Sequence, residues 1–120
     1  MAFGVILGAL GAHSLKALLS EASLETFQTG VRYHLIHALA LFSVGLAAPA
    51  GQLLKWRWPI RLILLGLVFF SGSIYLLSTM SISGLDILRP ILGPITPIGG
   101  LLWIGSWVWM AVSYVDDKRA

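Results

Sequence analysis

Four apolar stretches dominate this sequence, and their length is the feature that most restricts how it can fold. They cover residues 2–19, 31–48, 59–80 and 98–115, with short polar connections between them. About 20 apolar residues in a helix cross the roughly 30 Å of hydrocarbon in a bilayer. Hydrophobic residues form 58% of the 120-residue chain and charged residues 11%, and a soluble domain of this size cannot bury so much apolar surface. We therefore predict an all-α fold, an integral membrane four-helix bundle with short loops, as a single domain over 1–120.

The first stretch raises a question of length. The run from Met1 to Ala12 is shorter than the ~20 residues that a crossing helix needs. Either its helix continues through His13 and Lys16 towards Leu19, or the native chain begins upstream of Met1. Because no basic region leads the run and no small-residue cleavage site follows it, we interpret it as a retained span rather than a secretory signal.

Two connections have patterns of their own. Residues 18–29 alternate apolar with polar side chains, so we expect a short interfacial helix between spans one and two, with Ser23 as its N-cap. Residues 81–97 contain glycines and prolines, and we expect a broken turn there that lies against the membrane. The breaking residues are Gly84, Pro90, Gly93, Pro94 and Pro97.

The basic residues indicate an orientation. With four spans both termini lie on one side, and that side carries most of the lysines and arginines: Lys55, Arg57, Arg61, Lys118 and Arg119, against Lys16, Arg32 and Arg89. Cytoplasmic loops of membrane proteins carry the excess of Lys and Arg, so we predict a multi-pass membrane protein with both termini in the cytoplasm. Tryptophan and arginine favour the headgroup level, which predicts a membrane interface at Trp56, Arg57, Trp58 and Arg61.

Several classes of function lack their required residues. The chain has no cysteine, so disulfides, iron–sulfur clusters and thiolate zinc sites are excluded. The net charge of +3 is spread over the ends of apolar runs, without the basic cluster of a nucleic-acid module. No serine–histidine–aspartate set, phosphate-binding glycine loop or zinc-protease motif is evident. We predict that the protein is not an enzyme and has no catalytic residue, bound metal or other cofactor.

Polar side chains gather at the start of the second span. Gly30, His34, His37, Leu41 and Gly45 share one helical face. Ionisable residues at membrane depth suggest function by default, so we take as the candidate polar cluster His13, Lys16, Arg32, Tyr33, His34 and His37. Trp103 and Trp107, four residues apart, either line a ligand site or form an aromatic stripe that packs on lipid or a helix, and the stripe is the favoured interpretation.

Small residues in the spans predict close helix contacts. Gly4, Gly8 and Ala12 form a small-xxx-small ridge on the first helix. The full set that we assign to helix packing is Gly4, Gly8, Gly11, Gly30, Gly45, Gly66, Ser71, Gly72, Tyr75, Gly99 and Gly100.

Four sequence motifs resemble one known family. GALGAHSLKA, FQTGVRYHLIHALAL, FSGSIYLL and ITPIGGLLWIGSW occur in the order of the signature stretches of a domain-of-unknown-function family, small bacterial inner-membrane proteins of the YgdD and YwdK type. The resemblance covers most of the chain and implies four transmembrane helices, without a known reaction or substrate. Three positions differ from the family pattern. Leu10 stands where the usual GAFGAH motif has phenylalanine, Ser14 where a glycine or other small residue is common, and His34 where a variable polar residue is expected. The positions that match are Gly8, Gly11, His13, Lys16, Phe27, Gly30, His37, Ala38, Ser71, Gly72, Tyr75, Pro97, Gly99 and Gly100.

Three functional hypotheses follow. The favoured one is a structural or accessory membrane protein that acts on lipid or on a larger membrane complex. A small transporter or proton-linked carrier would use His13, Arg32, His34 and His37. A metal or haem site would use the imidazoles of the three histidines. The partners that we expect are membrane lipid and either further copies of the chain or a larger membrane protein, with no nucleic acid.

Overall fold

The structure is a computed structural model that describes residues 1–47 and 53–119, with side chains over 1–46 and 56–115. Every regular element in this part of the chain is helical. The elements are the α-helices α1 (Ala2–Ala12), α2 (Glu21–Ala47), α3 (Leu53–Gly66), α4 (Ser73–Ser83) and α5 (Arg89–Arg119), the 3₁₀ helices η1 (Leu15–Ala17) and η3 (Asp86–Leu88), and the π-helix η2 (Leu67–Gly72). The predicted end of the second span, at residue 48, lies outside the described residues.

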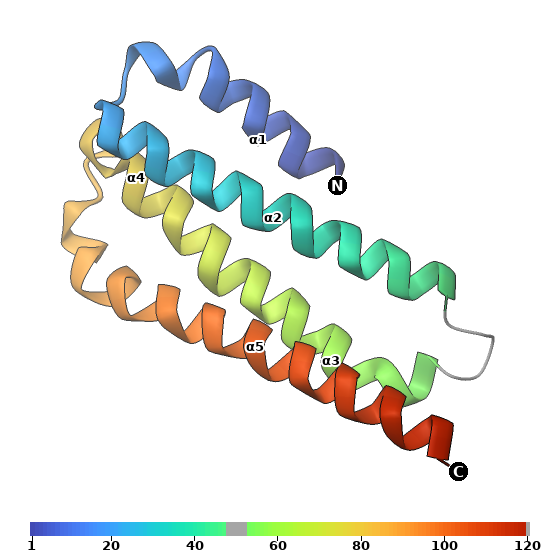
Figure 1. Ribbon diagram of the computed structural model, residues 1–120. Coiled ribbons are helices and arrows are strands. Elements are labelled where there is room, and N and C mark those ends of the chain that lie inside the picture. The colour runs from blue at the N-terminus through green and yellow to red at the C-terminus, as the bar shows by residue number, and fades with distance from the viewer. Residues whose placement is uncertain (48–52, 120) are drawn as a thin grey trace.

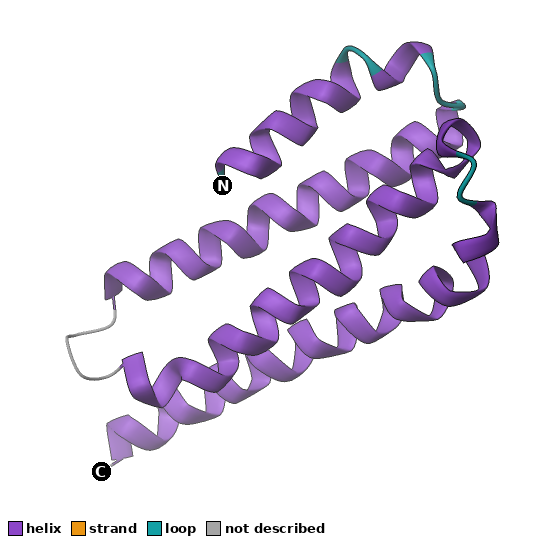
Figure 2. Cartoon of the chain, turned by 180° about the vertical axis from the view of Figure 1, so that it is seen from behind, coloured by secondary structure: helices purple, strands orange, loops and turns teal. Residues whose placement is uncertain are grey.

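The long helices lie side by side (Figures 1 and 2). Helix α3, η2 and α4 follow one another without a break and form the middle of the molecule, with α2 on one side and α5 on the other. Helix α1 packs on the outer side of α2. The Cα extents of 55 × 28 × 18 Å fit this flattened arrangement.

Glycines bring α1 against α2, as the small-residue ridge predicts. A Cβ atom on Gly4, Gly8 or Gly11 would lie 2.9–3.3 Å from α2 side chains, on Leu35, Val31 and Phe27 respectively. The third residue of this ridge is Gly11 and not the predicted Ala12, which is exposed. The order of the contacts shows that the two helices are antiparallel.

The closest backbone approach lies between α5 and the middle helix. A Cβ on Gly99 would overlap the backbone of Phe70, and one on Gly66 would overlap the indole of Trp103. Gly30 similarly admits α4, because a Cβ there would lie 2.8 Å from the side chain of Ile74.

Two of the predicted packing glycines have a different environment. A Cβ on Gly45 or Gly72 would meet no described atom within 4 Å, so the prediction of a close helix contact is wrong for both. A Cβ on Gly100 would lie 3.7 Å from Phe70, an ordinary van der Waals contact.

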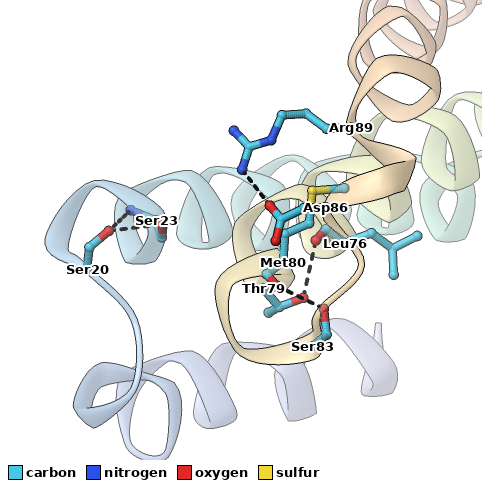
Figure 3. A network of polar contacts seen from close by, with 8 residues as sticks. All are labelled: Ser20, Ser23, Leu76, Thr79, Met80, Ser83, Asp86 and Arg89. Carbon is cyan, nitrogen blue, oxygen red and sulfur yellow. Dashed lines mark hydrogen bonds and ion pairs between the residues drawn. The ribbon is translucent and has the colours of Figure 1, made fainter.

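The predicted short helix between spans one and two is wrong. Helix α2 begins at Glu21 and runs without a break to Ala47. Its N-cap is Ser20, whose hydroxyl accepts the Ser23 N–H at 3.2 Å and donates to the Ser23 hydroxyl at 3.0 Å (Figure 3). An N-cap hydroxyl satisfies an otherwise free backbone N–H, and the observed cap lies three residues before the predicted one. The short helix in this connection is η1, immediately after α1.

The predicted broken turn over 81–97 is much shorter in the structure. Gly84, at φ 68°, ends α4, and α5 begins at Arg89 and continues through Pro94 and Pro97. Each proline removes one helical N–H donor. The hydroxyl of Thr96 donates to the Leu92 carbonyl at 3.3 Å, so a side chain adds a bond in this stretch.

The helices differ in the length that they offer to a membrane. The continuous segments Trp56–Ser83 and Asp86–Val115 are long and apolar enough to cross one. The first apolar helical segment continues beyond α1 through η1 to Ala17, which covers most of the expected continuation towards Leu19. Helix α1 itself has 11 residues and ends at Ala12. At 1.5 Å per residue it measures roughly 16 Å.

Candidate functional site

The candidate site is a groove at mid-length of the helices, where side chains of α2 and α5 meet over η2. Its volume is about 370 Å³. The lining residues are Tyr33, His37, Phe70, Gly100, Trp103, Ile104 and Trp107. We call this set the aromatic groove.

Trp103 forms the floor of the aromatic groove. Its side chain is buried, and its Nε1–H donates to the carbonyl of Ile63 at 3.1 Å. The imidazole of His37 lies flat on the indole, with ring centroids 3.6 Å apart and an interplanar angle of 7°. Tyr33 lies nearly parallel to the same indole at 5.8 Å. The missing side chain at Gly66 leaves the space that the indole occupies.

The hydrogen bonds of His37 define its protonation state. Its Nδ1 lies 2.9 Å from the carbonyl oxygen of Tyr33, and its Nε2 lies 3.3 Å from Nε1 of Trp107. A carbonyl only accepts and an indole N–H only donates, so His37 is neutral with its proton on Nδ1. Both ring nitrogens are therefore in use. A metal ion or a second proton would have to displace one of these bonds.

His34 belongs to a different part of the structure. It is buried against α1 and α4, where its Nδ1 lies 3.3 Å from the hydroxyl of Tyr75 and its ring lies 6.0 Å from that of Phe3. Tyr75 in turn lies against the ring of Phe27 at 5.0 Å. The two histidines of α2 thus join that helix to different neighbours.

The candidate polar cluster is divided among several places. Tyr33 and His37 line the aromatic groove, and His34 lies outside that lining. The other three members, His13, Lys16 and Arg32, are exposed. Over the described residues, no group of three or more His, Cys, Asp or Glu side chains can hold a metal ion, so the alternative hypothesis of a metal held by the three imidazoles has no support in this arrangement.

Comparison with known proteins places the chain in a family. The model of a family described as protein of unknown function DUF423 matches residues 7–100. The chain belongs to the DUF423 family. The UPF0382 membrane protein YwdK of Bacillus subtilis is 42% identical to it over 113 residues, which cover 91% of this chain and 84% of that protein. The UPF0382 inner membrane protein YgdD of Escherichia coli K12 is 33% identical over 115 residues, which cover 96% and 82%. No solved structure matches the chain.

The DUF423 match agrees with the predicted resemblance and covers part of the site. Tyr33, His37, Phe70 and Gly100 lie within the matched residues, and Trp103 and Trp107 follow directly after them. The i, i+4 spacings of Tyr33 with His37 and of Trp103 with Trp107 were visible in the sequence. What the sequence did not show is that the two pairs face each other, and Phe70 and Ile104 were missed for the same reason.

The predicted interface residues of this DUF423 chain are of two kinds. Trp58 is exposed, and the guanidinium carbons of Arg57 and Arg61 lie 5.7 and 5.1 Å from its ring centroid. These distances are in the range of cation–π contacts. Trp56 is partly buried and packs against the core of Ile63, Trp103 and Met110.

Proposed function

We propose that this chain is a multi-pass protein of the bacterial inner membrane whose four helical segments form a bundle with both termini in the cytoplasm. Its role in this proposal is structural or accessory, towards membrane lipid or a larger membrane complex. Relatives in the DUF423 family are named membrane proteins, and one is named an inner membrane protein.

The observation that carries the proposal is an apolar exterior on each long helix. Large hydrophobic side chains are more than half exposed on α1, α2, η2 and α5, among them Phe3 at 62%, Phe42 at 59%, Val68 at 62% and Leu101 at 66%. Soluble monomers rarely expose contiguous apolar patches larger than a few hundred Å². When hydrocarbon chains surround this surface instead of water, its exposure costs no hydrophobic free energy.

Polar side chains at the inner surfaces support the same proposal. The hydroxyl of Ser106 donates to the Pro59 carbonyl at 2.8 Å, and the hydroxyls of Ser73 and Thr96 lie 2.6 Å apart. Both contacts join neighbouring helices. Hydrocarbon offers no hydrogen-bonding partner, so a helix in a bilayer must satisfy its polar groups within the protein.

The bonds of the histidines favour a packing role over proton transport. His37 bonds the Tyr33 carbonyl of its own helix through Nδ1 and accepts from Trp107 of α5 at Nε2, and His34 joins α2 with α4. A relay through the histidines would instead need hydrogen bonds that connect them, and over the described residues no bond joins one histidine to another.

Single cysteines test the predicted topology, because the chain has none of its own. In spheroplasts, a membrane-impermeant maleimide should label Ser83→Cys, at the end of α4. Arg57→Cys, near the start of α3, should be labelled only after the membrane is permeabilised. The reverse pattern would contradict the orientation, and release of the protein by alkaline carbonate would contradict its place in the membrane.

A further inference from the structure

We propose that a polar pocket at one end of the bundle, separate from the aromatic groove, binds one phosphate group. The pocket lies where α2, α4 and α5 meet. Its lining residues are Ala22, Ser23, Thr26, Leu77, Ser78 and Arg89, and we call this set the Arg89 pocket. The inference goes beyond the proposed function, which names no binding site.

Small side chains leave the space for this pocket. Ala22 and Ser23 stand in the first turn of α2, and Ser78 of α4 lines the same pocket. Arg89 is the first residue of α5, and Figure 3 shows its side chain extended in the direction of Ser23. The volume is about 270 Å³. Most small-molecule sites measure about 300–1,000 Å³, so the Arg89 pocket suits one small group such as a phosphate.

Arg89 brings a positive charge with free donors into the lining. Its Nη2 lies 3.2 Å from Oδ1 of Asp86 (Figure 3). A guanidinium carries several N–H donors in one plane, so this single bond leaves most of them for a ligand. The side chains of Arg89 and Asp86 are 66% and 64% exposed, and an exposed ion pair of this kind contributes little to stability. A guanidinium also binds two phosphate oxygens with parallel hydrogen bonds.

Ser23 adds a second donor from the opposite helix. Its hydroxyl accepts the Ser20 hydroxyl at 3.0 Å, and over the described residues no acceptor takes its own proton. The other two hydroxyls of the lining, on Thr26 and Ser78, donate to carbonyl groups of their own helices. The oxygens of an ionised phosphate accept hydrogen bonds, so its donors in this pocket are Ser23 and Arg89.

The glutamates of α2 lie outside the pocket. With about 3.6 residues per turn, Ala22, Ser23 and Thr26 share one face of the helix, whereas Glu21 and Glu25 fall on the others. Over the described residues, neither glutamate pairs with the guanidinium of the pocket. The positive charge at the lining is therefore not neutralised from α2.

The level of the pocket matches that of the phosphates in a bilayer. The two segments that are long and apolar enough to cross a membrane end at Ser83 and begin at Asp86, three residues before Arg89. Ser78 precedes Ser83 by five residues, roughly 8 Å along the helix axis. The polar layer on each side of the hydrocarbon is about 5–8 Å deep. In the proposed membrane position a phospholipid headgroup reaches this pocket, and dissolved phosphate reaches it from the water.

Nuclear magnetic resonance titration of the full chain, in maltoside micelles without phosphate, tests the site. The probes are phosphatidylglycerol, a diacylglycerol glucoside with the same short acyl chains, and inorganic phosphate. The signals followed are the Nε–H of Arg89 and the backbone amide of Ser23. Phosphatidylglycerol should shift both signals with saturation, and the glucoside, which lacks phosphate, should shift neither. A saturable response to inorganic phosphate as well supports the site with dissolved phosphate as its source, and a response to the lipid alone supports it with the headgroup as its source.

Charge variants separate phosphate binding from a structural role of the ion pair. Arg89→Gln should weaken the affinity reported by the Ser23 amide about tenfold, equal to about 1.4 kcal/mol. Asp86→Asn removes the competing carboxylate and should raise the affinity, whereas a merely structural pair would be lost in both variants with the same effect. Arg32→Gln is the matched control, because Arg32 is exposed and lies outside the lining, and it should keep the native affinity.

A variant that keeps every charge tests the pocket itself. Ala22→Leu fills the space from an exposed position on α2. It should lose the response to phosphatidylglycerol while the far-ultraviolet circular dichroism stays that of the native chain.

The outcomes separate this inference from the proposed function. Equal shifts with phosphatidylglycerol and the glucoside would overturn the phosphate site, and so would a native affinity in Arg89→Gln or a native response in Ala22→Leu. These titrations are made in micelles and do not depend on the orientation in a membrane. A reversed maleimide pattern in spheroplasts would overturn the topology and leave the phosphate site in place.

Discussion

The crossing of α5 over the middle helix gives the sharpest stability prediction. In Gly99→Ala the new methyl group would lie 2.8 Å from Cα of Phe70 and would overlap its backbone nitrogen. Backbone atoms cannot rotate away as a side chain can, so the helices must separate. Overpacking of this kind costs about 1–3 kcal/mol.

A matched variant on the same helix isolates that effect. In Gly105→Ala the new methyl group would meet no described atom within 4 Å. Alanine is favoured over glycine within a helix by up to about 1 kcal/mol, and both variants gain this term. With the full propensity gain, Gly99→Ala should therefore be less stable than the native chain by up to about 2 kcal/mol, whereas Gly105→Ala should be equal to it or more stable.

The assay is unfolding in mixed micelles with increasing sodium dodecyl sulfate, followed by far-ultraviolet circular dichroism. Because the propensity gain is common to both, the two variants should differ in free energy of unfolding by the overpacking cost, about 1–3 kcal/mol. Equal stabilities would refute the close crossing at Gly99, and with it the packing that positions Phe70 and Trp103 in the groove.

Three further predictions use the same assay. Ser20→Ala removes the N-cap of α2 and should cost about 1 kcal/mol, while Ser14→Ala, without a cap bond, should change little; equal losses would argue against the cap. Trp107→Phe leaves Nε2 of the buried His37 unpaired and should cost about 1–3 kcal/mol, and the double variant with His37→Phe should cost less than the sum of the single changes; additivity would contradict the bond between them. Trp103→Phe removes the bond to Ile63 and should destabilise the chain by about 1 kcal/mol, and an unchanged midpoint would contradict that bond.

Much of the helical content follows from the sequence, for a simple reason. Apolar runs of bilayer length have few alternatives to helix, and glycine spacing marks the face where a neighbour approaches. Gly4 and Gly8 therefore predicted a close helix contact on α1, and the structure shows that the neighbour is α2. The family was also evident from the motifs, and the match over 7–100 agrees with it.

The errors concern positions where one local bond outweighs a propensity. Ser20, not Ser23, caps α2, because the hydroxyl three residues earlier reaches the free N–H. Pro94 and Pro97 remain inside α5 although proline usually ends a helix, and the Thr96 hydroxyl adds a bond to the Leu92 carbonyl between them. The sequence alone does not show which of these local effects decides where a helix begins or ends.

The aromatic groove was only half visible in the sequence. Tyr33 and His37 were predicted as candidate site residues, and Trp103 and Trp107 were considered for a ligand site. Their meeting depends on how α2 and α5 rest on the π-helix η2, which no helical repeat predicts. His13 and Lys16 were predicted to belong to the same polar cluster as Tyr33 and His37, but both side chains are exposed.

The central claim is that hydrocarbon covers the apolar exterior, and collision measurements on spin labels test it most directly. Single nitroxides would be placed at Val68→Cys and Leu101→Cys, which replace exposed side chains, and at Ser83→Cys beyond the predicted spans. In vesicles, oxygen should relax the labels at 68 and 101 more strongly than a water-soluble nickel chelate does, and the label at 83 should show the opposite. Stronger relaxation by the nickel chelate at 68 and 101 would contradict the account.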